Sequence, residues 1–269
     1  MQIVERYPDG VFCWVDLSTP DPAAAKAFYS GLFGWEVEDR PIDSGGVYSM
    51  LQIDGKNVAG LGEMQPEMQA QGIPAFWSSY VKHGDVDGIA AKMAAAGGTV
   101  MFPPMDVMDS GRMTIGMDPT GTPFGVWQPT GHIGAQLVNV PNTLVWNELQ
   151  TRQPDIARAF YEAVFGWASA ADENGYVTFA VNGRTQAGMI TMDENWGPEV
   201  PNNWSVYFMV EDVAAKAAQA EELGGSVMVP PTQAGAMGIF AVIQDPQGGV
   251  FNIMSFSGPV DPPPGYEKA

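Results

Sequence analysis

The residues of this chain that could do chemistry come in two matching sets, each with a carboxylate beside a tryptophan. Asp16 lies two positions after Trp14, and Glu148 lies two positions after Trp146. Residues two positions apart in a strand point to the same face of the sheet, so each carboxylate should share a face with its indole. Such a carboxylate could act as a general base or draw a cation onto the aromatic ring.

Each pair stands at the start of a segment that occurs twice in the chain. Residues 14–35 read WVDLSTPDPAAAKAFYSGLFGW, and residues 146–167 read WNELQTRQPDIARAFYEAVFGW. A second segment, residues 77–104, is repeated as residues 204–231. Each copy is followed by a D-P turn and a last strand. A repeat of this length is too long for a solenoid. It therefore indicates two homologous domains in tandem.

The residue pattern of each repeated segment predicts a strand, a helix and further strands. In the first half we expect helices at 23–33 and 85–96 and strands at 11–17, 36–39, 47–53, 57–61, 75–81, 99–101, 112–117 and 123–128. In the second half we expect helices at 155–165 and 213–223 and strands at 143–149, 176–181, 186–192, 204–210, 226–228, 239–243 and 250–255. Asp21 is the expected cap of the first helix, and Gly34 is its expected end.

These elements predict an α+β fold of four β-α-β-β-β units that form curled mixed sheets. The domain boundaries that we expect are 8–130 for the first domain and 143–257 for the second. Residues 131–142 link the two domains, and residues 258–269 form a Pro-rich tail that we expect to be loosely ordered. The linked domains could pair within one chain, so we expect a monomer or a weak homodimer.

Composition and charge restrict the class of function. The net charge of −19 and pI near 4.2 repel phosphate backbones and anionic lipid, so we expect neither a nucleic acid nor a membrane as partner. We see no apolar run long enough to span a bilayer and no secretory signal at the N-terminus. The single cysteine, Cys13, sits in a predicted strand and fits a small core residue. These features favour a cytoplasmic protein.

Three motifs occur in the same order in both halves: a helix A-[KR]-A-F-Y-x-x-x-F-G-W, a strand entry G-G-[TS]-V and a closing hairpin D-P-x-G-x-x-F. With them the sequence resembles the vicinal oxygen chelate superfamily, which includes glyoxalases, bleomycin-resistance proteins and extradiol dioxygenases. The paired FGW motifs are also similar to two-domain glyoxalase-like antigens and hydroxylases of actinobacteria. The resemblance implies that paired units curl into clefts. It does not imply one activity, because one fold hosts many.

In metal-dependent members of that superfamily, inward positions on the first and last strands of each unit supply the ligands. Carried over by spacing, these positions are Trp14, Ala59, Ser78 and Gly125 in the first half and Trp146, Ala187, Ser205 and Asn252 in the second. None of them suits a divalent ion, which needs converging imidazole or carboxylate groups. The two histidines, His83 and His132, lie elsewhere in the chain. We therefore expect no metal and no other cofactor; a carboxylate-only site would need Asp16 or Glu148.

Strand alternation extends the set of residues that should line the clefts. The predicted ligand-binding residues are Trp14, Asp16, Tyr48, Met50, Ser78, Tyr80, Arg112 and Trp127 in the first half, with Trp146, Glu148, Ser205, Tyr207 and Asn252 in the second. An aromatic cleft with few polar groups suits a small, flat organic molecule. A carboxylate beside the indole favours a cationic one.

The residue types leave several functions open. The first is a metal-free protein that binds a small, flat or cationic organic molecule, in the manner of drug-sequestering resistance proteins; this is the function that we expect. The alternative is a glyoxalase-type lyase or isomerase, or a dioxygenase-like enzyme, that acts on a small carbonyl or aromatic metabolite. A third is a metal-free enzyme with Asp16 or Glu148 as general base. A fourth alternative is that Trp14 and Trp146 fill the clefts as core residues and that neither cleft binds a ligand.

Overall fold

The computed structural model describes residues 3–42, 45–258 and 260 of the 269-residue chain. The first half comprises β1 (Phe12–Thr19), α1 (Pro22–Phe33), β2 (Glu36–Pro41), β3 (Val47–Ile53), β4 (Lys56–Glu63), α2 (Pro66–Ala70), β5 (Phe76–Lys82), α3 (Val86–Ala95), β6 (Thr99–Val107), β7 (Gly111–Met117) and β8 (Pro123–Pro129). The second half comprises β9 (Leu144–Thr151), α4 (Pro154–Phe165), β10 (Ala168–Ala171), β11 (Val177–Val181), β12 (Arg184–Thr191), β13 (Asn203–Met209), α5 (Val213–Glu222), β14 (Ser226–Ala234), β15 (Gly238–Gln244) and β16 (Val250–Phe256).

The helix ends follow the local signals in the sequence. The Asp21 side chain accepts a hydrogen bond from the Ala24 N–H at 3.0 Å, so it caps α1. Gly34 ends α1 with φ of 72°, a left-handed conformation that glycine adopts without steric cost. Gly166 ends α4 in the same conformation, with φ of 69°. The repeated FGW motif thus stops the first helix of each half at its glycine.

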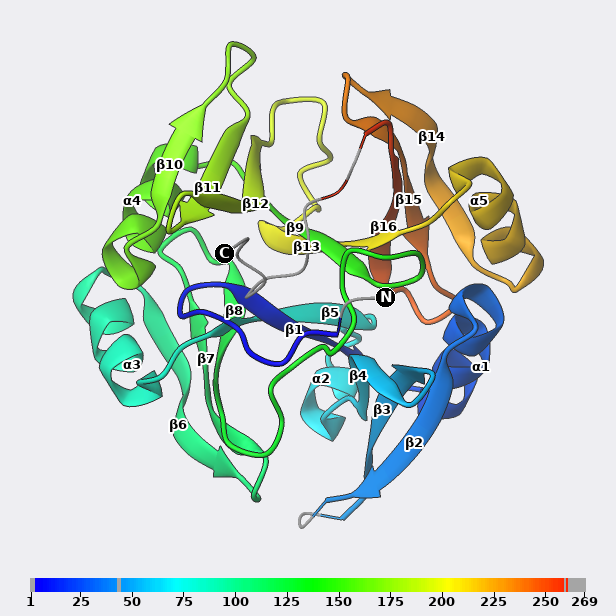
Figure 1. The fold of residues 1–269 in the computed structure, drawn as a ribbon, viewed down its shortest axis with the longest axis horizontal. Helices are drawn as coiled ribbons and strands as arrows, with labels where there is room; N and C mark the ends of the chain where they lie inside the picture. The colour runs from blue at the N-terminus through cyan, green and yellow to red at the C-terminus, as the bar shows by residue number, and fades with distance from the viewer. Residues whose placement is uncertain (1–2, 43–44, 259, 261–269) are drawn as a thin grey trace.

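Each half forms one eight-stranded mixed sheet, as Figure 1 shows. The strand orders are β2-β3-β4-β1-β5-β8-β7-β6 and β10-β11-β12-β9-β13-β16-β15-β14, so the two halves share one topology. In each sheet the two central strands, β1 and β5 or β9 and β13, are antiparallel, and each has a parallel neighbour on its other side. The predicted α+β fold of tandem β-α-β-β-β units is therefore confirmed.

The two halves interlock through their helices. Helix α1 lies beside α5, and α3 lies beside α4, at opposite sides of the molecule (Figure 1). The Phe33 ring at the end of α1 packs 5.2 Å from Phe208 and 5.9 Å from Phe251, both in the second half. Burying a ring of this size contributes about 1.5–3 kcal/mol. The apolar face of each first helix therefore completes the core of the other half.

The tryptophans of the FGW motifs fasten the same interface. Trp35 Nε1 donates to the Asn142 carbonyl at 2.8 Å, and Trp167 Nε1 donates to the Gly10 carbonyl at 2.8 Å. Each indole thus reaches the segment that enters the first strand of the other half. The tryptophan of each FGW motif therefore stabilises the contact between the two halves.

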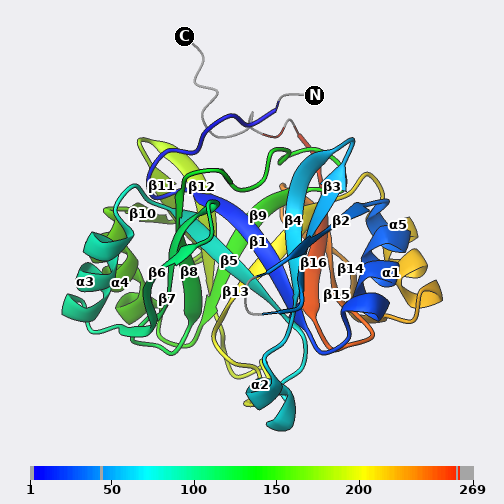
Figure 2. The same cartoon turned by 90° about the horizontal axis from the view of Figure 1, so that it is seen from below.

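Some elements differ from the sequence prediction. Helix α2 is not among the predicted helices, and β10 was not predicted because its sequence ASAA carries no β-branched or aromatic residue. Figure 2 shows α2 at one end of the molecule, and the N-terminal segment and the linker crossing the other end. The predicted loose order of the tail falls almost wholly outside the described residues. Within the described part of the chain, no helix is long and apolar enough to cross a membrane.

Candidate functional site

The central strands of the first sheet bring four predicted residues onto one face. Trp14 on β1 pairs with Tyr80 on β5, and Asp16 pairs with Ser78. Directly paired residues point to the same side of a sheet, and residues two apart do as well. The four side chains therefore form one floor, with the indole and the carboxylate next to each other as the sequence predicts.

Two tyrosines hold the carboxylate of that floor. The Tyr48 and Tyr80 hydroxyls both donate to Asp16 Oδ2, at 3.1 and 3.2 Å. Trp14 Nε1 in turn donates to Tyr48 Oη at 2.9 Å. Indole, phenol and carboxylate thus form one chain of hydrogen bonds that fixes the orientation of each ring.

On the second sheet, a matching second floor is formed by Trp146, Glu148, Ser205 and Tyr207. Its hydrogen bonds around Glu148 repeat those around Asp16. Tyr207 Oη donates to Glu148 Oε1 at 2.8 Å, and Tyr176 Oη donates to Oε2 at 3.0 Å. Trp146 Nε1 donates to Tyr176 Oη at 3.1 Å, as Trp14 does to Tyr48. Tyr176 was predicted as the first residue of a strand but not as a residue of the cleft; it lies just before β11.

Glycine makes room for the tyrosines on the neighbouring strands. A Cβ at Gly60 would lie 1.9 Å from Tyr48 Oη, and a Cβ at Gly188 would lie 1.8 Å from Tyr176 Oη. Gly60 pairs with Asp16, and Gly188 with Glu148, so these glycines face the floors.

This register corrects two positions that were assigned by spacing. Ala59 and Ala187 precede the floor glycines by one residue, so their side chains point to the opposite face. Both alanines are fully buried there.

Burial changes the acidity of both carboxyls. Desolvation raises the pKa of Asp16 to about 6, although hydrogen bonds from Tyr48, Tyr80 and Ser78 oppose the shift. Desolvation likewise raises the pKa of Glu148 against its tyrosine hydrogen bonds. Among the described residues, neither carboxylate has a lysine or arginine in an ion pair. With a pKa of about 6, Asp16 is ionised at neutral pH, so the first floor carries a negative charge that no side chain of the described part neutralises.

The remaining predicted residues fall into two groups. Met50 and Trp127 are buried on the floor side of the first sheet, and Asn252 donates to Ser205 Oγ in the second. The expectation that Arg112 lines the first cleft is corrected. It pairs with Gln128, one residue beyond Trp127, so it lies on the opposite face of the sheet.

Arg112 is engaged on that opposite face. Its guanidinium donates two hydrogen bonds of 2.9 Å to Asp87 and one of 2.9 Å to Asp106. Asp87 belongs to α3, so Arg112 ties a strand to a helix.

His132 is a cleft residue that the sequence did not reveal. Its ring packs edge-on at 4.5 Å from Trp14, and Trp127 Nε1 donates to its carbonyl at 2.7 Å. Burial, aided by the charge of Arg40, lowers the pKa of His132 to about 4, so the imidazole is neutral at pH 7. The linker thus folds back over the first floor, and nothing in the local sequence pattern signals that return.

The donor sets do not fit a divalent metal ion. Each floor offers one carboxylate. The first floor adds hydroxyls and the single imidazole of His132, which lies against Trp14, and the second adds hydroxyls and the Asn252 amide. Both oxygens of Glu148 already accept from tyrosine hydroxyls. The described residues contain no group of three or more His, Cys, Asp and Glu side chains placed to hold a metal. Divalent ions need more anionic or imidazole ligands than either floor brings together.

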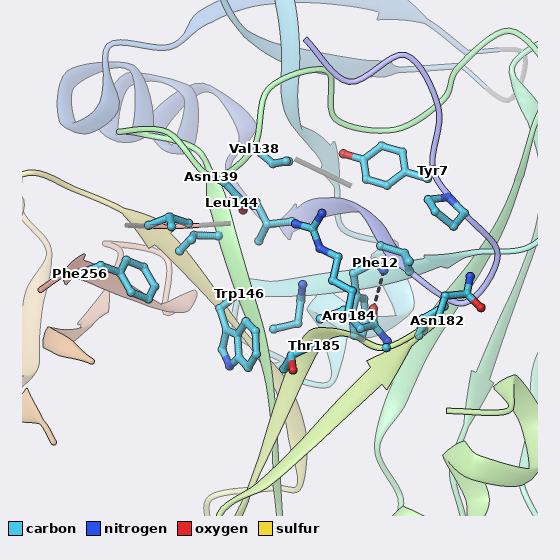
Figure 3. Close-up of a pocket in the computed structure, with 18 residues that line it drawn as sticks. Tyr7, Phe12, Val138, Asn139, Leu144, Trp146, Asn182, Arg184, Thr185 and Phe256 are labelled. Atoms are coloured by element: carbon cyan, nitrogen blue, oxygen red, sulfur yellow. Dashed lines mark hydrogen bonds between the residues drawn. The ribbon is translucent and has the colours of Figure 1, made fainter. Parts of the chain in front are cut away.

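A cavity of about 460 Å³ lies beside Trp146, at the end of the second sheet (Figure 3). The N-terminal segment supplies Tyr7 to its wall, β1 supplies its first residue, Phe12, and β12 supplies Arg184 and Gln186. Neither Asp16 nor Glu148 lines it. The cavity is therefore adjacent to the second floor but separate from its carboxylate.

Comparison with known proteins places the chain among related sequences. The Glyoxalase/Bleomycin resistance protein/Dioxygenase superfamily model matches residues 12–127, and a Glyoxalase-like domain model matches residues 146–254. The "Putative glyoxylase CFP32" of Mycobacterium tuberculosis is 44% identical over 255 residues, which cover 93% of this chain and 96% of that protein.

A second relative and a solved structure extend the comparison. "Anthracycline biosynthesis protein DauV" of Streptomyces sp. (strain C5) is 35% identical over 93% of this chain and 94% of its own. The Mn(II)-bound glyoxalase from Novosphingobium aromaticivorans has a similar fold, with a TM-score of 0.64 and 18% identity over 95% of this chain and 85% of that one. At that identity the structural likeness concerns the fold alone.

Proposed function

Since this chain belongs to the glyoxalase/bleomycin resistance/dioxygenase superfamily, we propose that it binds a small, flat, cationic organic molecule on the floors of its two sheets, without a metal ion. The observation that carries the proposal is the Asp16 carboxylate, which lies beside the Trp14 indole and is held by two tyrosine hydroxyls. An aromatic face next to an uncompensated negative charge attracts an organic cation through charge and cation–π contact.

Three further features support this ligand class. The tyrosines and indoles are fixed by hydrogen bonds before any ligand arrives, and preorganised aromatic groups bind at low entropic cost. The donor sets lack the ligands that a divalent ion requires, as argued above. A relative named for anthracycline biosynthesis supports an organic ligand of the ring-bearing kind.

The test uses 9-aminoacridine, a flat cation, with acridine-9-carboxylate as the matched anion. Titration is followed by quenching of tryptophan fluorescence. We expect the cation to bind more tightly than the anion, and Asp16→Asn to weaken cation binding about tenfold. Asp54→Asn is the control, because it removes the same charge from an exposed hairpin turn. Equal binding of both probes, or an equal effect of the two variants, would refute the proposal.

Elemental analysis of the untagged protein tests the metal-free part of the proposal. We expect no stoichiometric divalent metal and no change of melting temperature on addition of chelator. A stoichiometric metal, with stability that chelator removes, would instead support the metal-dependent lyase that the names of the relatives suggest.

A second candidate is proton transfer at a small carbonyl compound, with Asp16 as general base. A raised pKa near 6 favours it, because a base works best when its pKa is close to the operating pH. In this reaction the carboxylate would take a proton from the carbon next to the carbonyl, and a tyrosine hydroxyl would donate to the resulting oxyanion. Loss of deuterium from labelled dihydroxyacetone, measured by NMR, would support it if Asp16→Asn abolished the exchange.

A further inference from the structure

One oxygen of the Asp16 carboxylate is left open in the first floor. The Tyr48 and Tyr80 hydroxyls both donate to Oδ2, and Oδ1 accepts no close hydrogen bond from the described residues. Burial raises the pKa of Asp16 and the Ser78 hydroxyl opposes that rise, but it donates no close hydrogen bond to either oxygen. Oδ1 is not one of the buried polar atoms that lack a partner, and Asp16 is half-buried, so solvent reaches this oxygen.

The second floor leaves no such oxygen. Tyr207 Oη donates to Glu148 Oε1 and Tyr176 Oη donates to Oε2, so each oxygen already has a partner. Glu148 is also more deeply buried than Asp16, with only 8% of its surface exposed. A ligand could therefore reach this carboxylate only by sharing an oxygen that a tyrosine already uses.

A single difference between the halves accounts for the two arrangements. Gly125 on β8 pairs with Tyr80, and a Cβ at Gly125 would lie 2.2 Å from the Tyr80 ring, so the ring lies against the glycine. The residue that pairs with Tyr207 is Asn252, whose side chain occupies the equivalent position and donates to Ser205 Oγ. Tyr207 cannot lie as Tyr80 does, and its hydroxyl bonds the opposite carboxylate oxygen from that of the other tyrosine.

An open carboxylate oxygen favours a ligand that brings an N–H donor. With a pKa of about 6, Asp16 is ionised at neutral pH, so Oδ1 can only accept. A hydrogen bond between an ionised donor and a carboxylate is roughly twice as strong as one between neutral groups. A quaternary ammonium ion has no N–H and would meet Oδ1 by charge alone.

We propose that the first floor selects organic cations that carry an N–H donor, such as protonated amines and amidines, through Oδ1 of Asp16, and that the second floor makes no such selection. This inference deepens the floor proposal and rests on it for the positive charge of the ligand. For an N–H cation the first floor is accordingly the tighter of the two sites.

The experiment compares 2-naphthylmethylammonium with its N,N,N-trimethyl analogue by isothermal titration calorimetry at neutral pH. Both are flat cations of equal charge, and only the first has N–H donors. We expect the tighter site of the wild type to prefer 2-naphthylmethylammonium by at least about tenfold. Asp16→Asn should reduce this preference to about twofold or less, because the neutral amide forms weaker hydrogen bonds. Glu148→Gln should leave the preference unchanged within about twofold.

A residue exchange tests the cause of the difference between the floors. Gly125→Asn gives the first floor the residue of the second, so it should displace the Tyr80 ring and lower the preference for the N–H cation. Gly121→Asn is the matched control, because its Cβ would meet open space in the turn before β8 and asparagine tolerates a positive φ. If Gly125→Asn fails to fold, Asp16→Asn and Glu148→Gln still decide the matter.

The outcomes separate this inference from the floor proposal. Binding of neither cation to the wild type would refute the floor proposal itself. Equal binding of the two cations would leave that proposal standing and overturn the inference. A preference that survives in Asp16→Asn would reflect the size of the methyl groups and would overturn it as well, as would a preference that is lost in Glu148→Gln.

Discussion

The Tyr29 hydroxyl donates to Asp245 Oδ2 at 2.8 Å and so joins the first helix of one half to the closing turn of the other. Trp77 Nε1 donates to the same hydroxyl at 3.1 Å. Oδ1 of Asp245 meanwhile accepts from the backbone N–H groups of Gln247 and Gly249. One phenol therefore links three segments at a buried point between the halves.

Replacing that phenol should destabilise the whole molecule. Tyr29→Phe removes the donor from a buried carboxylate, which typically costs about 1–3 kcal/mol. We expect a lower midpoint of urea unfolding with one cooperative transition, because the helix core is shared between the halves. Lys26→Gln on the same helix is the control, because it removes only an ion pair to the exposed Asp39. Two separate transitions in Tyr29→Phe would contradict the interlocked core.

A methyl group at the first floor should disturb the site more than one placed nearby. In Gly60→Ala the new Cβ would lie 1.9 Å from Tyr48 Oη, so the phenol must move away from Asp16. Gly62→Ala is the matched control on the same strand, because its Cβ would meet Tyr48 only at 3.5 Å. We expect Gly60→Ala to lower stability by about 1–3 kcal/mol and to weaken binding of 9-aminoacridine. Equal effects of the two variants would show that Tyr48 is not held as described.

Arg112 should have no part in binding despite its place in the predicted cleft. Its guanidinium bonds Asp87 and Asp106 on the face away from the floor. Arg112→Gln should therefore leave the dissociation constant of 9-aminoacridine unchanged within about twofold. Tyr80→Phe, on the floor itself, should change it, because that variant removes a hydrogen bond to Asp16. Fluorescence titration of both variants decides the matter.

Local signals in the sequence were enough to predict most of the fold. Asp21 caps the first helix and Gly34 ends it, as their residue types predict. Strand alternation correctly placed Trp14 on the same face as Asp16. Each of these features depends on residues that are close together in the chain.

The errors concern relationships between distant segments. Counting along the chain could not detect that β4 presents Gly60, not Ala59, to the floor, because strand register is set by the partner strand. Tyr176 could have been found by comparing the halves, since Tyr48 precedes Gly60 by the same spacing as Tyr176 precedes Gly188. His132 lies in a linker whose return over Trp14 carries no local signal.

The pKa of Asp16 predicts opposite pH dependences for stability and for ligand binding. The folded pKa of about 6 lies above the ordinary value of 3.8. Below about pH 4 the carboxyl is protonated in both states and costs nothing. Between pH 4 and 6 the unfolded chain loses its proton first, so the folded state loses stability until the folded group also ionises. At one unit per 1.36 kcal/mol, and reduced for partial exposure, the loss is about 1–3 kcal/mol.

Asp16→Asn removes this titration, so its stability relative to the wild type should rise between pH 4 and 6 and stay level above pH 6. Binding of an organic cation should change the other way in the wild type, because protonation below pH 6 removes the attracting charge. Urea unfolding and titration with 9-aminoacridinium, each at a series of pH values, measure the two trends on the same protein. Glu148→Gln, which leaves Asp16 intact, should retain the wild-type loss of affinity near pH 6. If cation affinity in the wild type stayed constant from pH 7 to 5, Asp16 could not be the group that attracts the ligand.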